Sequence, residues 1–160
     1  MLNSIGIRSD YLESLCKKIL HKFDNVLPCD YFEKQNIDVA KEYYYILNLD
    51  QSSKPGSHFI ALAIKNKKVL FFDSFGRKCD NKFIVNKLKS LGLTNLIYSK
   101  VCVQCPFNSK FCSFYCVAFL ISIQEKSFES FLSLFHQNDL TKNDRICINI
   151  IKEHIKRNVK

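Results

Sequence analysis

The chain has 160 residues, 47% of them hydrophobic, and carries 24 Lys and Arg against 15 Asp and Glu. This length and apolar content indicate one domain with a sizeable core over residues 1–160, and argue against two domains. No apolar run approaches the ~18 residues of a membrane helix, and the first ten residues, MLNSIGIRSD, lack the layout of a signal peptide. We therefore expect an intracellular protein without membrane contact.

Eight cysteines and a formal net charge of +9 are the two compositional features that need an explanation. Without a secretion signal, the cysteines are more typical of free thiols than of a disulfide framework. The positive charge favours contact with DNA or another polyanion. A basic surface that only keeps the protein solvated is the equally weighted alternative.

The first half of the chain predicts one helix followed by strands. Ser9 is expected to cap a helix that ends before residues 24–28. The aromatic and β-branched run at 43–49 predicts a strand. Residues 58–64 and 69–72 predict two more strands, and their nearly continuous apolar character indicates the middle of a sheet that is covered on both faces.

The second half alternates helical patterns with one further strand. Asp80 is expected to cap a helix, and residues 96–103 predict a strand. Later helices are expected around Phe128 and after a capping pair formed by Thr141 and Asp144. The predicted fold class is α+β, with a central mixed β-sheet flanked by helices.

The stretch around Cys112 has the strongest functional signal. From this residue the sequence CSFYCVAFLISI has no polar face, which predicts a buried helix with Cys112 in or near its first turn. The partial positive charge of a helix N-terminus favours a thiolate and lowers the pKa of a cysteine. Cys112 is therefore a candidate nucleophile.

His58 and Asp73 are the candidate partners of that nucleophile. A two-residue hairpin loop at either 65–66 or 66–67 pairs His58 with Asp73 or with the residue two further on. Both registers place the two side chains on one face, close enough for the imidazole Nδ1–H to meet the carboxylate. Cysteine, histidine and carboxylate form a nucleophile, a base and an orienting group, and Gln104 is placed to stabilise an oxyanion.

Three segments, GSHFIALAI, LFFDSFG and QCPFNSKFCSFYC, resemble in order and spacing the His, acidic and Gln…Cys blocks of the adenovirus proteases (adenains), and more distantly those of the ubiquitin-like-protein proteases. The resemblance implies a papain-like, adenain-like cysteine protease fold. It assigns His58 as general base, Asp73 as its carboxylate, Gln104 to the oxyanion hole and Cys112 as nucleophile. Leu93 stands at about the position of the cysteine that links adenain to its activating peptide.

The resemblance also implies a function and its setting. We expect a monomeric thiol endopeptidase that cleaves structural precursor proteins of a virus or mobile element next to Gly, in the virion and host nucleus. No cofactor is expected to be required, and stimulation by DNA, by another polyanion or by an activating peptide stays open.

Two alternatives remain at this stage. One is a protease that removes ubiquitin or a ubiquitin-like modifier. The other is a non-catalytic basic module that binds nucleic acid or zinc, because four cysteines crowd into one stretch. They are Cys102, Cys105, Cys112 and Cys116. Their spacing differs from the common zinc pattern, and Cys116, Cys16, Cys29, Cys79 and Cys147 are interpreted as core residues.

Overall fold

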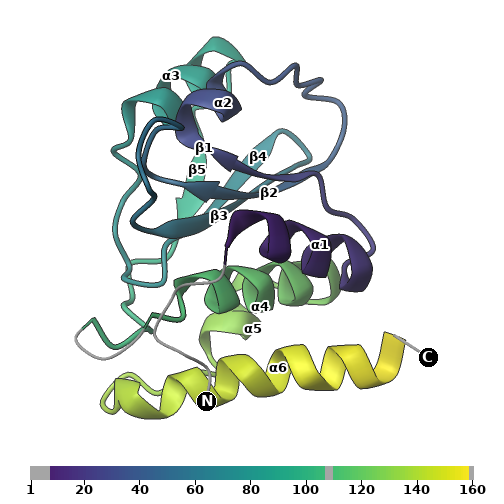
Figure 1. Ribbon diagram of the computed structural model, residues 1–160, viewed down its shortest axis with the longest axis vertical. Coiled ribbons are helices and arrows are strands. Elements are labelled where there is room, and N and C mark those ends of the chain that lie inside the picture. Colours follow the sequence, from purple (N-terminus) through teal and green to yellow (C-terminus); the bar gives the residue numbers. More distant parts are fainter. Residues whose placement is uncertain (1–7, 107–109, 159–160) are drawn as a thin grey trace.

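A computed structural model describes residues 8–106 and 110–158, which fold around a five-stranded sheet (Figure 1). The strands lie side by side in chain order: β1 (Asn25–Pro28), β2 (Tyr43–Asn48), β3 (Phe59–Lys65), β4 (Lys68–Phe72) and β5 (Leu96–Tyr98). The outer pairs, β1 with β2 and β4 with β5, are parallel, and the two inner pairs are antiparallel. The sheet is therefore mixed, as predicted.

Helices cover both faces of the sheet. On one face lie α1 (Ser9–Ile19), α4 (Cys112–Glu125), α5 (Phe128–Leu132) and α6 (Asn143–Asn158), and on the other lie α2 (Cys29–Glu33) and α3 (Lys82–Ser90) (Figure 1). A short 3-10 turn, Leu140–Lys142, precedes α6. Each face has its own apolar core. The predicted α+β class is confirmed.

Strand β3 is the centre of this arrangement because both of its faces are buried. Small side chains, Ala61 and Ala63, point to the α4 side, whereas Ile60, Leu62 and Ile64 belong to the opposite core. Alanines let the backbone of α4 pack directly on the strand. The prediction of a strand in the middle of a doubly covered sheet is confirmed, and α4 is held directly against this strand.

The β3–β4 hairpin closes through a two-residue turn. Asn66 and Lys67 have φ angles of 52° and 58°, the left-handed conformation that this turn requires at both positions. The flanking pair is Lys65 with Lys68, so the second of the two predicted registers is the correct one. Extended toward the strand ends, this register places His58 opposite Phe75 and diagonal to Asp73.

Several predicted helix caps were wrong by a few residues. Ser9 is the first residue of α1, and Arg8 stands at the N-cap without a side-chain capping bond. Asn81, not Asp80, caps α3, because its side-chain oxygen accepts the N–H groups of the next turn. Thr141 hydrogen-bonds to Asp139 within the 3-10 turn and does not cap α6.

Two strand predictions also need correction. The strand predicted at 96–103 ends at Tyr98, since the Ser99 hydroxyl bonds both backbone groups of Val101 and turns the chain away from β4. The segment expected only to end the first helix instead forms β1, and α2 follows it. Both elements are short, so their apolar pattern was too brief to detect.

All eight cysteines, each of them within the described residues, are free thiols, as predicted. None of the helices in the two described ranges combines the length and the apolar character that a bilayer span requires.

Candidate active site

Strand direction brings the predicted site residues to one end of the sheet. His58 directly precedes β3, and Asp73 directly follows the antiparallel β4. Strand β5 runs parallel to β4, so the chain leaving it toward Gln104 starts from the same end. His58, Gln104 and Cys112 all line one cleft with a volume of about 1050 Å³. Asp73 lies behind the imidazole, away from the cleft.

His58 contacts the carboxylate through Nε2, which lies 2.9 Å from Asp73 Oδ1. The prediction that Nδ1 would make this contact was therefore wrong. The ring is fixed in this orientation by Phe75, which stacks on it with the ring centroids 4.8 Å apart. Because Nε2 is used by Asp73, Nδ1 is the nitrogen that remains for the hydrogen bond with the thiol of Cys112.

Asp73 is held ionised by three donors. Besides His58, the Phe75 N–H donates to Oδ1 at 2.9 Å and Arg77 Nε donates to Oδ2 at 3.0 Å. Burial raises the pKa of Asp73, but the hydrogen bonds and the nearby positive charges together lower it by more, so the net shift is downward. The buried carboxylate can therefore orient His58 and stabilise its protonated form.

The pKa values of Cys112 and His58 shift in opposite directions. Burial disfavours the thiolate, but the hydrogen bond with His58 and the backbone of Phe59 and Ser113 lower the pKa of Cys112 below 9.0. Burial likewise disfavours the imidazolium, yet the bonds to Asp73 and Cys112 raise the pKa of His58 to about 9. Both shifts favour the thiolate–imidazolium form of the pair.

The other cysteines lack this environment. Burial raises the pKa of Cys16 to about 12 and that of Cys79 to about 11. It also raises the pKa of Cys29, Cys102, Cys116 and Cys147. Cys16, Cys29, Cys79, Cys116 and Cys147 are buried, which confirms their interpretation as core residues. In contrast to these six thiols, Cys112 has a lowered pKa.

Gln104 is buried at the cleft and its side chain is held by Ser74, which follows Asp73 in the chain. The Ser74 hydroxyl donates to Gln104 Oε1 at 2.5 Å. The Ser74 carbonyl accepts the N–H groups of Val103 and Gln104 at 2.9 and 3.1 Å. Because Oε1 accepts the Ser74 hydrogen bond, Nε2 lies on the opposite side of the amide group. An oxyanion hole needs an N–H donor, and Nε2 is the atom of this side chain that carries one.

Gly76 allows this close approach between the Asp73 turn and the Gln104 segment. Its N–H bonds the Asp73 carbonyl at 2.8 Å, and its φ of +72° favours glycine. A Cβ at this position would lie 2.6 Å from the Val101 carbonyl carbon and 2.7 Å from the Cys102 nitrogen. A larger residue here would push the two segments apart.

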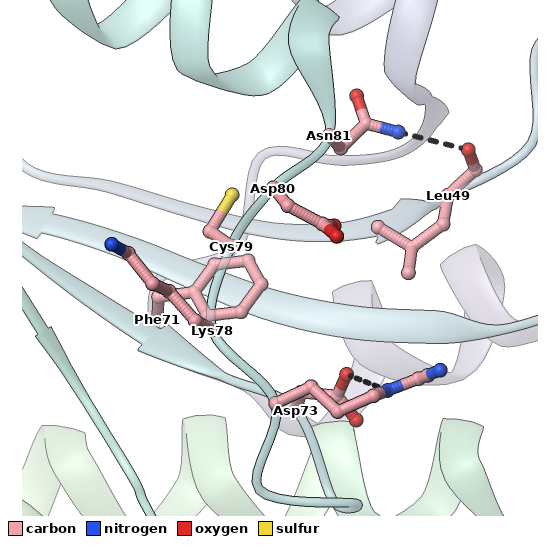
Figure 2. Close-up of a pocket in the computed structure, with 8 residues that line it drawn as sticks. Leu49, Phe71, Asp73, Lys78, Cys79, Asp80 and Asn81 are labelled. Carbon is pink, nitrogen blue, oxygen red and sulfur yellow. Dashed lines mark hydrogen bonds and ion pairs between the residues drawn. The ribbon is translucent and has the colours of Figure 1, made fainter.

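A second, smaller cavity of about 80 Å³ lies on the far side of Asp73 (Figure 2). Asn81 Nδ2 donates to the Leu49 carbonyl at 3.0 Å and joins the two segments at one side of this cavity. Cys79 and Asp80 also line it. Arg77 lines both this cavity and the cleft, so the Asp73–Arg77 ion pair separates the two spaces.

Ser74, Phe75 and Arg77 were missed as functional residues in the sequence. Each lies within four positions of Asp73 and touches a member of the site. The available signal was the short run after β4, in which polar and aromatic residues and a glycine form a tight turn beside a candidate carboxylate.

The alternative interpretation as a zinc module requires side chains that converge on one metal ion. Across residues 8–106 and 110–158, no three His, Cys, Asp or Glu side chains converge in a way that could hold a metal ion. Cys116 faces the core from α4 while Cys112 faces the cleft, so the four clustered cysteines do not share one centre.

No protein-family model and no curated protein sequence matches this chain. Solved structures do match. The ASFV pS273R protease superposes with a TM-score of 0.60 at 12% identity, covering 89% of this chain and 67% of that chain. The SUMO protease Ulp1, solved with its catalytic cysteine oxidised to a sulfonic acid, superposes with a TM-score of 0.51 at 18% identity. This match covers 95% of this chain and 80% of the Ulp1 chain.

These likenesses show the fold. The chain has the fold shared by pS273R and Ulp1, as the sequence predicted. Its cleft brings His58, Gln104 and Cys112 together, with Asp73 bonded to His58. The more specific resemblance to adenain stays a prediction.

Proposed function

We propose that this chain is a cysteine endopeptidase in which Cys112 is the nucleophile, His58 the general acid and base, Asp73 the orienting carboxylate and Gln104 an oxyanion donor. The observation that carries the proposal is the lowered pKa of Cys112 beside a buried His58–Asp73 pair. A buried ion pair at the mouth of a cleft is costly for a protein that does not use it.

The first half of the reaction acylates the enzyme. The Cys112 thiolate attacks the scissile carbonyl carbon, and the carbonyl oxygen gains a negative charge that Gln104 Nε2–H and the N-terminus of α4 stabilise. As the C–N bond breaks, the His58 imidazolium transfers its Nδ1 proton to the leaving amine. The products are a thioester on Cys112, a free amine and a neutral imidazole.

The second half releases the acyl group. Neutral His58 takes a proton from water, and the resulting hydroxide attacks the thioester carbonyl. Collapse of the intermediate expels the Cys112 thiolate and yields a carboxylic acid. His58 is again protonated beside the ionised Asp73, so both groups return to their starting charge.

For the substrate, we propose structural precursor proteins of a virus or mobile element, cleaved next to Gly. The likeness to ASFV pS273R, a viral protease by its name, and the sequence resemblance to the adenovirus proteases support this choice. The second candidate is cleavage of a ubiquitin-like modifier, which the likeness to the SUMO protease Ulp1 favours. Incubation with Gly-containing capsid precursor peptides and with SUMO precursors separates the two.

Labelling with a peptide that ends in a thiol-reactive group tests the nucleophile. We expect one adduct, on Cys112, located by mass spectrometry. Cys112→Ala should lose both labelling and turnover, whereas Cys105→Ala, a matched change of a partly exposed thiol nearby, should keep both. Full turnover by Cys112→Ala would refute the proposal.

We also propose that DNA or another polyanion binds the basic surface around α3. Exposed Lys78, Lys82 and Lys89 line a groove there with a volume of about 630 Å³. Binding driven by counterion release must weaken steeply with salt. Affinity for DNA of unrelated sequences, measured over a salt series with Cys112→Ala protein, tests this, and no binding at low salt would exclude it.

A further inference from the structure

Arg77 stands in the cleft as a fixed cation. Its Nε donates to Asp73 Oδ2 at 3.0 Å, and its guanidinium lies over the Phe75 ring at 5.1 Å from the centroid. Two contacts from different directions leave this side chain little rotational freedom. The side chain is nevertheless 56% exposed and lines the cleft that contains Cys112.

The outer end of the guanidinium is available to a ligand. Asp73 uses only Nε, and within residues 8–106 and 110–158 no hydrogen bond or ion pair involves the terminal Nη1 or Nη2. Those two nitrogens form a planar fork that fits a carboxylate with two parallel hydrogen bonds. A preorganised fork loses little conformational entropy when such a group binds.

The charge of the cleft favours an acidic ligand. Its other charged lining side chains besides His58 and Cys112 are Arg8, Asp10 and Lys110. Arg8 and Asp10 form an ion pair with each other at 3.2 Å, so they largely cancel. Arg77 then places a guanidinium at the wall of the cleft next to the reacting pair, with its terminal nitrogens on the exposed side of its ion pair with Asp73.

The position of Arg77 indicates which part of a substrate it meets. The general acid protonates the leaving amine, so residues after the scissile bond must pass next to His58. The Phe75 ring stacks on His58, and the Arg77 guanidinium lies over the same Phe75 ring. Arg77 is therefore the cleft cation next to the imidazole, with Phe75 in contact with both. These two ring contacts place it within roughly 10 Å of the imidazole, the reach of about three extended residues.

We propose that Arg77 binds the carboxylate of an Asp or Glu among the first three residues after the scissile bond, and so makes this protease prefer substrates that are acidic on the leaving-group side. The inference rests on the proposed peptidase function. It adds a specificity that the catalytic groups alone do not supply.

The test compares matched peptides. Peptides with Glu or Gln at the first, second or third position after the cleaved bond are assayed for kcat/KM with wild-type enzyme. We expect Glu to be favoured at one of these positions by about 5-fold at low salt, the effect of a charge-assisted contact at a half-exposed site. Glu placed before the bond should give no such gain, and high salt should reduce the preference.

The variant Arg77→Gln should abolish the Glu preference. This change also removes a donor from Asp73 and lowers the rate on every peptide, but the Glu-to-Gln ratio within one enzyme divides out that common loss. Lys78→Gln is the matched control, because Lys78 carries the same charge one residue away and does not line the cleft. It should keep the preference unchanged.

Binding measured without catalysis separates this inference from the proposed function. Cys112→Ala protein should bind the preferred Glu peptide about 5-fold more tightly than its Gln partner, and the double variant with Arg77→Gln should bind both equally. Equal binding and equal turnover of the Glu and Gln peptides at all three positions would overturn the role of Arg77. Turnover that survives Cys112→Ala would instead overturn the peptidase mechanism.

Discussion

Removing the Ser74 hydroxyl should weaken catalysis without touching the nucleophile or the base. Ser74 does not line the cleft, and within residues 8–106 and 110–158 its side chain reaches the site through its bond to Gln104 Oε1. In Ser74→Ala the amide oxygen of Gln104 loses the hydrogen bond from the Ser74 hydroxyl. Gln104 can then rotate or flip, and its Nε2 spends less time where the oxyanion forms.

The magnitude follows from the burial of this hydrogen bond. Gln104 and Ser74 are each 1% exposed, so the hydrogen bond between their side chains is shielded from water. A neutral hydrogen bond contributes ~0.5–1.5 kcal/mol net, and ~1.4 kcal/mol corresponds to a tenfold change in rate. We expect kcat to fall about 10-fold in Ser74→Ala, against about 100-fold in Gln104→Ala, which removes the donor itself.

A double-mutant cycle on kcat tests the pathway of the effect. In a Gln104→Ala background, Ser74→Ala should change kcat by less than twofold, because the group that Ser74 orients is already absent. KM should change little in either background. Ser74→Thr retains the hydroxyl and should recover most of the activity, and thermal unfolding of each variant identifies any loss of folded protein.

Two results would refute this reasoning. If Ser74→Ala has wild-type kcat, the hydroxyl does not orient Gln104. If it costs the same factor with and without Gln104, Ser74 acts on the fold and not through the oxyanion donor.

Three further predictions concern the ion pair and its support. The pH profile of kcat/KM should rise as Cys112 ionises, below the ordinary 9.0 of a thiol, and fall as His58 loses its proton near pH 9. His58→Ala should cost nearly as much as loss of Cys112, whereas Asp73→Asn should cost less and move the alkaline limb to lower pH, measured on the same peptide. Gly76→Ala should lower kcat and the melting temperature together, because its Cβ would collide with Val101; an unchanged melting temperature would contradict this.

The sequence alone predicted the parts of the fold that depend on local pattern. Continuous apolar runs gave β3 and β4 their place inside the sheet, and the lack of a polar face from Cys112 onward predicted that α4 begins there and is buried. The short hairpin loop allowed only two strand registers, and both place His58 and Asp73 on the same face of the sheet. Such features follow from residues close together in the chain, so no knowledge of distant contacts was needed.

Where the local sequence pattern allowed two residues or two atoms equally well, the tertiary structure selected one of them. Asp80 and Asn81 are both good helix caps, and only the path of the chain past Leu49 selects Asn81. Likewise, either imidazole nitrogen of His58 can meet a carboxylate. The stacked Phe75 ring and the observed hairpin register select Nε2.

The residues that adjust the site were visible only in three dimensions. Ser74 and Gln104 are 30 positions apart and meet because β5 runs parallel to β4 and returns the chain to the same end of the sheet. Arg77 contributed to the net charge of the sequence like any other basic residue, and its fixed place between Asp73 and the cleft comes from the turn at Gly76. The sequence therefore determined which chemical groups the site has, and long-range packing determined how they are oriented, because orientation depends on contacts between segments that the chain brings together only when it folds.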